Sequence, residues 1–256
     1  MDSEKLQQLL RIAILAAEAA SLEILKVYNS ADFEVDSKSD NSPLTLADKN
    51  SHDTIEKLLK ETDLPILSEE GKIISYETRK DWEYFWLIDP LDGTKEFIKR
   101  NGEFTVNIAL VHKQTPILGV VAVPVTADVY YSSRGAGAYR KYPDVESPIP
   151  KRTPADLSKT GLRIVGSRSH MNDETEAFIQ KFDSPELISA GSSLKFMLLA
   201  SGAADVYPRF APTMEWDTAA PHAILNEVGL KVFRQNSDQE LQYNKPDLLN
   251  PHFICY

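Results

Sequence analysis

The stretch Trp86-Leu87-Ile88-Asp89-Pro90-Leu91-Asp92-Gly93-Thr94 determines how the rest of the chain is interpreted. It begins as an apolar run and ends in two closely spaced aspartates. Pro90 fixes one backbone torsion angle, and Gly93 permits a reversal of the chain. We therefore predict a buried strand over residues 84–88 that ends in a rigid turn, from which Asp89 and Asp92 face one point.

Two carboxylates held this close repel each other, and each raises the pKa of the other unless a cation lies between them. Oxygen ligands without histidine or cysteine favour a hard ion, Mg²⁺ or Mn²⁺, over zinc. The spacing alone therefore predicts a metal site. An Asx-type turn without a metal is the alternative.

Two other acidic segments are expected to accompany this turn. Residues 65–68 form a second short apolar run, and it delivers Glu69 and Glu70 at its end. Taken alone, this pair is also typical of a solvated surface turn. Asp217 stands at the start of a helix predicted over residues 217–228, where helix capping is the simpler interpretation.

The patterning of the whole chain predicts layers of helices and sheets, an α/β arrangement of the layered α+β kind. For the first half we expect helices over residues 6–27 and 45–62, an edge strand over 33–38 and an antiparallel meander over 104–140. In the second half, strands at 163–166, 187–189, 205–207 and 231–233 alternate with helices at 173–182, 193–200 and 217–228. Four prolines between residues 143 and 154 indicate a linker. We therefore predict an antiparallel-rich lobe over residues 1–150 and a mixed-sheet lobe over residues 151–256.

Composition excludes several classes of protein. The chain carries 28 Lys and Arg against 38 Asp and Glu, a net charge of −10, which disfavours binding to nucleic-acid polymers or anionic membranes. Cys255 is the only cysteine, so the sequence predicts no internal disulfide and fits a reducing cytoplasm. The apolar run over residues 12–17 is too short to span a bilayer, so we expect no transmembrane segment.

Three ordered motifs carry a resemblance to a known family. They are Glu69-Glu70, Asp89-Pro90-Leu91-Asp92-Gly93-Thr94 and Trp216-Asp217-Thr218-Ala219-Ala220. Together they resemble the inositol-monophosphatase-like superfamily of metal-dependent, lithium-sensitive phosphatases, which implies the sugar-phosphatase fold of that superfamily. Longer strings, residues 86–98, 102–107 and 191–196, are most similar to bacterial 3′(2′),5′-bisphosphate nucleotidases of the CysQ type. The likeness covers essentially the whole chain.

The resemblance implies a set of metal ligands. Glu69, Asp89 and the backbone carbonyl of Leu91 would hold one Mg²⁺, and Asp89, Asp92 and Asp217 a second. Four carboxylates then balance the charge of two ions, so that a phosphate dianion meets a neutral cluster. Two or more Mg²⁺ per site are expected.

The catalytic groups implied by the resemblance are Asp48, Glu70 and Thr94. Thr94, hydrogen-bonded to Asp48, would orient the attacking water, and Glu70 would accept a hydrogen bond just behind the ligands. Asp48 is also the acidic member of a predicted capping box with Thr45. The motifs Gly-x-Ser-x-Gly and Cys-x₅-Arg are both absent, so direct attack by a metal-activated water is expected, without a phosphoenzyme.

Substrate contacts are also carried over from the family pattern. The predicted set is Glu69, Leu91, Asp92, Gly93, Thr94, His170, Gly191, Ser192, Lys195, Arg209 and Asp217. Residues 191–193 precede a helix, whose N-terminus offers N–H groups to a phosphate, although an ordinary helix cap explains them equally well. For His170, Lys195 and Arg209 the alternative is a surface salt bridge. Pro221 departs from the family pattern and is expected to alter the start of the predicted 217–228 helix.

The activity expected from the resemblance is removal of the 3′-phosphate from adenosine 3′,5′-bisphosphate to give AMP, with its sulfated form as a further candidate substrate. This places the protein in sulfur metabolism, in the cytoplasm or peripherally on the inner membrane. An inositol monophosphatase or fructose-1,6-bisphosphatase of the same fold is the alternative enzyme. A sensor without catalysis is the alternative from another class, but it would be expected to lack a ligand or Thr94. The sequence leaves the oligomeric state open.

Overall fold

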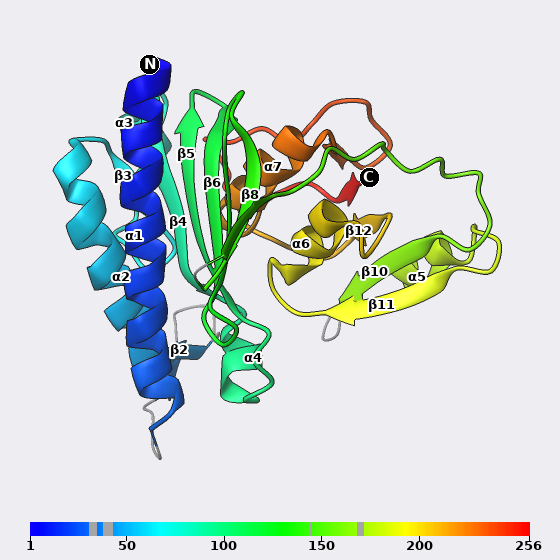
Figure 1. Ribbon diagram of the computed structural model, residues 1–256, viewed down its shortest axis with the longest axis horizontal. Helices are drawn as coiled ribbons and strands as arrows, with labels where there is room; N and C mark the ends of the chain where they lie inside the picture. The colour runs from blue at the N-terminus through cyan, green and yellow to red at the C-terminus, as the bar shows by residue number, and fades with distance from the viewer. Residues whose placement is uncertain (31–34, 38–42, 144, 168–171) are drawn as a thin grey trace.

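The computed structural model describes residues 1–30, 35–37, 43–143, 145–167 and 172–256, except for the side chains of residues 35–37, 43–45 and 167. Its elements form alternating layers of helix and sheet, which confirms the predicted fold class (Figure 1). Within these ranges, no helix is both long and apolar enough to cross a membrane.

A seven-stranded sheet lies at the centre of the first half, in the order β3-β4-β5-β6-β7-β8-β9. Its strands are β3 (Ile66–Ser68), β4 (Tyr84–Asp92), β5 (Thr105–His112), β6 (Thr115–Val123), β7 (Asp128–Ser133), β8 (Gly137–Tyr142) and β9 (Val145–Pro148). From β4 onward the neighbours are antiparallel, as the meander predicted, whereas β3 runs parallel to β4. The parallel pair places the ends of β3 and β4 side by side.

Two helices cover one face of this sheet: α1 (Ser3–Tyr28) and α2 (Leu46–Leu59), the latter continued by a 3₁₀ turn, η1 (Lys60–Thr62). Apolar residues of both helices form one core with alternate residues of β4 to β7. Trp86 is fully buried there, and its indole N–H donates to Thr62 over 2.9 Å. The three- and four-residue spacing of the sequence therefore corresponds to a buried helix face.

The opposite face of the sheet packs against α7 (Glu215–Val228), and α6 (Leu194–Ser201) packs on α7 within the same second core. Gly119 on β6 allows α7 to approach closely, because a Cβ there would lie 2.1 Å from the Ala220 carbonyl oxygen. Beyond these helices lie the small strands of the second half and α5 (Asp173–Ile179) (Figure 1).

The second half combines parallel and antiparallel pairs, as expected for a mixed sheet. Strand β10 (Arg163–Ser167) runs parallel to β11 (Glu186–Ala190), and β12 (Tyr207–Arg209) and β13 (Val232–Arg234) flank β14 (Phe253–Cys255) antiparallel to it. A single parallel bridge between Ile164 and Val206 connects the two groups. The division into lobes at residue 150 stays a prediction.

Several predicted boundaries were wrong. Strand β4 does not end at Ile88 but continues to Asp92, with an irregular register between Asp89 and Asp92. The proline-rich stretch contains β9 rather than linker alone, because Pro148 lies at the sheet edge where its missing N–H is tolerated. Helix α7 begins at Glu215, two residues before Asp217, and contains Pro221 in its interior.

Some elements were not predicted. These are β2 (Pro43–Thr45), which pairs with β1 (Val35–Ser37), together with α3 (Tyr76–Arg79), α4 (Thr94–Ile98), β9 and β14. The predicted strand over residues 33–38 is described only at 35–37. Helix α5 ends at Ile179, three residues earlier than expected.

Candidate active site

The ends of β3 and β4 bring Glu69 next to Asp89. Ser68 pairs with Ile88 in parallel register, and the N–H of Glu69 donates to the carbonyl of Ile88 over 3.2 Å. The next residue on each strand therefore lies at the same edge of the sheet. Helix α7 adds Asp217 from the other half, and carboxylate oxygens of Glu69, Asp89 and Asp217 lie within 4.8 Å of one another.

The irregularity in β4 separates the roles of Asp89 and Asp92. The Oδ1 atom of Asp89 accepts the N–H of Leu91 over 3.1 Å, so the Asx-type turn considered from the sequence is present. Asp89 is 1% exposed, whereas Asp92 lines an open cavity. Asp89 therefore makes the turn and also belongs to the acidic cluster, so the Asx-type turn is compatible with a role as a metal ligand.

Asp217 is fixed as the third residue of α7. Its Oδ2 atom accepts the N–H of Met214 over 2.9 Å, which is one half of a capping box. Burial, reinforced by the negative charges of Asp92 and Glu69, raises the pKa of Asp217 well above its ordinary value. The capping interpretation is thus correct, and the same side chain also faces the other acids.

A buried ionic group positions the start of α7. Glu215 is fully buried, and its carboxylate accepts the N–H groups of Asn244 and Lys245 over 2.6 and 3.0 Å. Asn244 in turn accepts from Arg79 over 2.8 Å, on the segment that follows Glu69 and Glu70. Burial raises the pKa of Glu215, and the charge of Lys245 opposes this effect.

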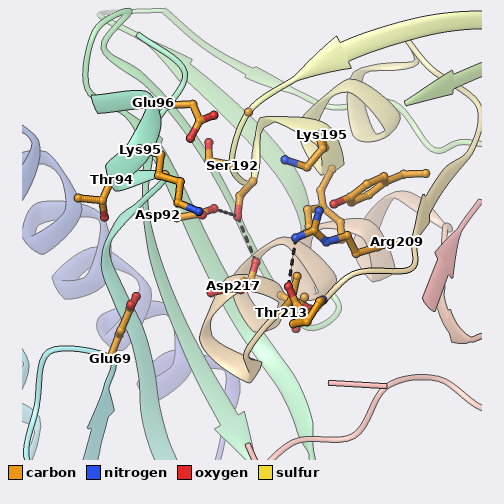
Figure 2. A pocket seen from close by; sticks show the side chains of 17 residues that line it. Glu69, Asp92, Thr94, Lys95, Glu96, Ser192, Lys195, Arg209, Thr213 and Asp217 are labelled. Atoms are coloured by element: carbon orange, nitrogen blue, oxygen red, sulfur yellow. Dashed lines mark hydrogen bonds between the residues drawn. The ribbon is translucent and has the colours of Figure 1, made fainter. Parts of the chain in front are cut away.

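The acidic cluster opens into a cavity of about 330 Å³. It lies between the two halves of the chain and is lined by Glu69, Asp92, Gly93, Thr94, Lys95, Glu96, Gly191, Ser192, Ser193, Lys195, Phe196, Tyr207, Arg209, Pro212, Thr213, Asp217 and Thr218. Figure 2 shows Glu69, Asp92 and Asp217 on one side of this cavity and Lys195 and Arg209 on the other. The cavity thus combines an acidic and a basic wall.

Thr94 and Asp48 meet at the acidic end, although 45 residues separate them in the sequence. Asp48 lies in the first turn of α2 and is 1% exposed, and Thr94 is the first residue of α4. The Thr94 hydroxyl donates to Asp48 Oδ1 over 3.2 Å, with the Leu91 carbonyl 3.4 Å away. The predicted pair is therefore in contact. The side chain of Thr45, its expected capping partner, lies outside the described residues.

Gly93 allows the backbone to turn from β4 into α4 without a steric clash. Its φ of +94° lies in the left-handed region, where a side chain is strained. A Cβ atom would also lie 3.2 Å from both the Glu103 carbonyl oxygen and the Ser192 Cβ. The chain can therefore turn from β4 into α4 beside the other half of the molecule only with glycine at this position.

The basic wall consists of Lys195 on α6 and Arg209 on β12. Lys195 is 6% exposed, its Nζ atom lies 5.8 Å from the centre of the Tyr207 ring, and its nearest hydrogen-bond acceptor is the Ala190 carbonyl at 3.5 Å. Burial lowers the pKa of Lys195 to about 8, although the charge of Asp92 opposes the shift. Arg209 donates to the Pro212 carbonyl over 3.1 Å. Among the described residues, both side chains bond to backbone carbonyls, and neither forms the surface salt bridge considered as the alternative.

Other predicted contacts differ in how far they reach the cavity. Gly191 lines it, but its N–H already donates to Glu103 over 2.8 Å. Ser192 also lines it, and its buried hydroxyl has no partner among the described residues. Glu70 and Leu91 are adjacent to cavity residues without lining it. His170 lies outside the described residues.

The sequence interpretation missed several lining residues, notably Lys95, Glu96, Tyr207, Thr213 and Thr218. Lys95 and Glu96 directly follow Thr94, so their position in the motif was a usable signal. Thr218 directly follows Asp217 in the same way, and Tyr207 lies two residues before Arg209. Thr213 lies in a loop with no pattern that marks it.

Similarity to known proteins accounts for this set of side chains. The inositol monophosphatase family matches residues 5–255. The chain belongs to the inositol monophosphatase family. It is 43% identical over 252 residues to the 3′(2′),5′-bisphosphate nucleotidase CysQ of Salmonella typhimurium, covering 97% of this chain and 98% of that protein.

Solved structures of the family share the fold. The crystal structure of CysQ from Bacteroides thetaiotaomicron, a bacterial member of the inositol monophosphatase family, is 46% identical with a TM-score of 0.86, over 97% of each chain. The inositol monophosphatase from Anabaena is 26% identical with a TM-score of 0.75, over 98% of this chain and 90% of that one. The inositol monophosphatase architecture is therefore retained across this range of identity.

Proposed function

We propose that this protein is a Mg²⁺-dependent 3′(2′),5′-bisphosphate nucleotidase that removes the 3′-phosphate of adenosine 3′,5′-bisphosphate to give AMP. The observation that carries the proposal is the single cavity with acids on one wall and Lys195 and Arg209 on the other. A nucleotide with two phosphates needs cations beyond those at the reacting phosphate, and the basic wall provides them. The names of the curated relatives support the same substrate class.

The acidic wall fits a hard divalent ion. Its donors are oxygens only, and the raised pKa of Asp217 reflects repulsion and burial that a cation would relieve. Glu69, Asp89, the Leu91 carbonyl, Asp92 and Asp217 would hold Mg²⁺. When bound, two such ions neutralise the acids and stabilise the charge that develops during phosphoryl transfer.

The remaining catalytic and binding roles are assigned to side chains of the protein. The Thr94 hydroxyl donates to Asp48, so an oxygen lone pair of Thr94 is left to accept a hydrogen bond from the attacking water. Asp48 is the buried carboxylate that receives the proton through Thr94. Glu70, next to the ligand Glu69 in the sequence, helps to hold the metal ligands in place. Lys195, Arg209 and Ser192 bind the nucleotide, and the sulfated nucleotide is a second substrate of the same kind.

The proposal is tested by phosphate release from three substrates under identical conditions in Mg²⁺. We expect kcat/KM for adenosine 3′,5′-bisphosphate to exceed that for inositol 1-phosphate and fructose 1,6-bisphosphate. Addition of Li⁺ is expected to inhibit the reaction. A preference for either sugar phosphate would instead assign the protein to the alternative enzymes of the fold, and no turnover of any substrate would favour a sensor.

A further inference from the structure

Ser193 stands at the N-cap of α6, where a serine ordinarily caps its own helix. Its side chain makes no such bond. The Oγ atom instead lies 2.8 Å from Asp92 Oδ2 and 3.1 Å from the Asp217 carbonyl oxygen, and Figure 2 marks both contacts with dashed lines. Ser193 is 1% exposed, so this arrangement is buried.

Asn107 on β5 determines the direction of the Ser193 hydroxyl. The amide nitrogen of Asn107 lies 2.8 Å from Ser193 Oγ and acts as a donor there. Ser193 has one proton, so it accepts from Asn107 and donates to Asp92 or to the Asp217 carbonyl. Asn107 is fully buried and cannot turn toward solvent.

Pro221 explains why the Asp217 carbonyl is available to Ser193. In an α-helix this carbonyl would accept the N–H of the residue four positions later, and that residue is Pro221, which has none. The carbonyl therefore lacks its helical partner and shares the single Ser193 proton with Asp92 Oδ2, which is the nearer acceptor. The departure from the family pattern noted in the sequence thus has a local consequence.

The same contacts orient the Asp92 carboxylate. Ser193, Thr105 and Asn107 reach Asp92 over 2.8, 3.3 and 3.4 Å, and all three bonds end on Oδ2. With Oδ2 occupied by these donors, Oδ1 is the oxygen left for a ligand. Ser193 and Asp217 come from the second half of the chain and Asp92 from the first, so the network joins the two halves at the acidic wall.

We propose that Ser193 is a positioning residue that, with Asn107, fixes the Asp92 carboxylate relative to Asp217 and leaves one Asp92 oxygen to the metal. This inference rests on the proposed function, because it assigns Asp92 and Asp217 to the metal. Partners that orient a ligand typically contribute 10- to 100-fold to metal affinity, so the loss of the Ser193 hydroxyl is expected to weaken Mg²⁺ binding by about 10-fold.

The test is calorimetric titration of Mg²⁺ into metal-free protein, with thermal melting in EDTA as a second readout. The variants are Ser193→Ala, Asn107→Ala and Ser193→Thr, which keeps the hydroxyl. Ser21→Ala is the control, because Ser21 is also buried, at 9% exposure, but bonds only to the Ala17 carbonyl on α1. Ser193→Ala is expected to bind Mg²⁺ about 10-fold more weakly than the wild type, and its metal-free melting temperature is expected to fall as well, because the buried Asn107 amide loses a partner. Asn107→Ala is expected to weaken binding too, whereas Ser193→Thr and Ser21→Ala retain wild-type affinity.

Equal affinity in Ser193→Ala and the wild type would overturn the inference alone and leave the proposed function standing. A lowered metal-free melting temperature together with unchanged Mg²⁺ affinity in Ser193→Ala would assign the residue a purely structural role, which also overturns it. A wild-type protein that binds no Mg²⁺ would overturn the proposed function and this inference together.

Discussion

Thr94 illustrates how much depends on a single hydroxyl at the residue scale. Its proton is donated to the buried Asp48 carboxylate, so in the proposed mechanism the Thr94 oxygen is left to accept a hydrogen bond from the attacking water. Thr94→Ala is expected to lower kcat by about 10²- to 10⁴-fold, the usual contribution of a positioned proton-transfer group, with Mg²⁺ affinity little changed. Steady-state kinetics and Mg²⁺ titration measure the two quantities separately.

Thr54→Ala on α2 is the control, because that hydroxyl bonds only within its own helix. An activity of Thr94→Ala equal to that of this control would reduce the Thr94 and Asp48 pair to a structural contact.

Because the pKa of Lys195 is lowered, we expect substrate capture to depend on pH. Burial lowers the pKa of Lys195 to about 8, so the side chain is charged below this pH and neutral above it. Because kcat/KM reports the free enzyme, its value for the bisphosphate is expected to fall as the pH rises through about 8. Lys195→Arg keeps its charge throughout this range and should flatten the decline. The measurement is kcat/KM from pH 6.5 to 9.5 for both proteins.

A small phosphate monoester serves as the comparison substrate, since it does not need the basic wall. The interpretation fails when the monoester and the bisphosphate lose kcat/KM in parallel, or when Lys195→Arg declines like the wild type.

At the scale of single elements, α7 carries a buried histidine that links stability to pH. His222 is 1% exposed, and its ring contacts Tyr243 at 2.9 Å and Glu240 at 3.0 Å. Burial lowers the pKa of His222 despite the nearby Glu240, so the folded protein favours the neutral ring. The unfolded chain then binds more protons below pH of about 6.5, and the free energy of unfolding falls as the pH is lowered from there.

We therefore expect His222→Gln to reduce the loss of unfolding free energy between pH 7 and pH 5, measured by urea denaturation. At pH 7 the variant should itself be less stable by about 1–3 kcal/mol, because Tyr243 and Glu240 lose a buried partner. The His222 bond lowers the pKa of Glu240 to about 2. Glu240 therefore changes the free energy of unfolding mainly below its pKa in the unfolded chain, which lies under the range from pH 5 to pH 7. His112→Gln, a partly exposed histidine on β5, is the control. Identical pH slopes in the wild type and His222→Gln would contradict the assignment.

The elements that the sequence predicted are those with a long periodic pattern. The amphipathic spacing of α1 and the apolar runs of β4 to β7 extend over many residues, and their packing agrees with the local preference. The missed elements are short: α3 and α4 have four and five residues, and β14 has three. Such segments depend on tertiary partners, as β14 does on β12 and β13, and a local pattern cannot identify them.

At the scale of the whole molecule, the acidic wall predicts that metal and folding are linked. An ion that binds only the folded state adds about 2.7 kcal/mol at 100 times its dissociation constant, or roughly 5–10 °C in Tm for a chain of this size. Mg²⁺ is therefore expected to raise the Tm of the wild type relative to protein in EDTA. In Asp92→Asn the Mg²⁺ effect should shrink and turnover should be lost, while the Tm in EDTA rises because repulsion with Asp217 is relieved.

Melting curves with and without EDTA measure this prediction, and the Mg²⁺-independent control is Asp63→Asn, an acid at the end of η1. If Mg²⁺ left the Tm of the wild type unchanged, or if Asp92→Asn showed normal turnover, Asp92 would be removed from the proposed ligand set.

The candidate site was predictable where a compact motif carries it. Asp89, Asp92 and Thr94 follow from nine consecutive residues, and the resemblance supplied Asp48 and Asp217. The contact between Ser193 and Asn107 was not predicted, although both residues lie in strings that carry the resemblance, because 86 residues separate them and no local pattern pairs them. Contacts between the two halves depend on the tertiary packing of α6 and α7, which the local sequence does not specify.

The position of α7 has a consequence for how the protein is made. On the ribosome, β4 to β7 emerge well before α7. At about 5–20 residues per second, roughly 6–25 seconds pass between the synthesis of Thr94 and that of Asp217, and one apolar face of the sheet is uncovered during this time. During this interval the nascent chain has an incomplete acidic cluster and a surface that attracts other apolar segments. Ribosome-bound chains stalled at residue 200 are expected to bind a hydrophobic dye and a chaperone, and full-length chains released from the ribosome are not. Equal dye binding by both would contradict this consequence, because it would show that the absence of α7 adds no exposed apolar surface.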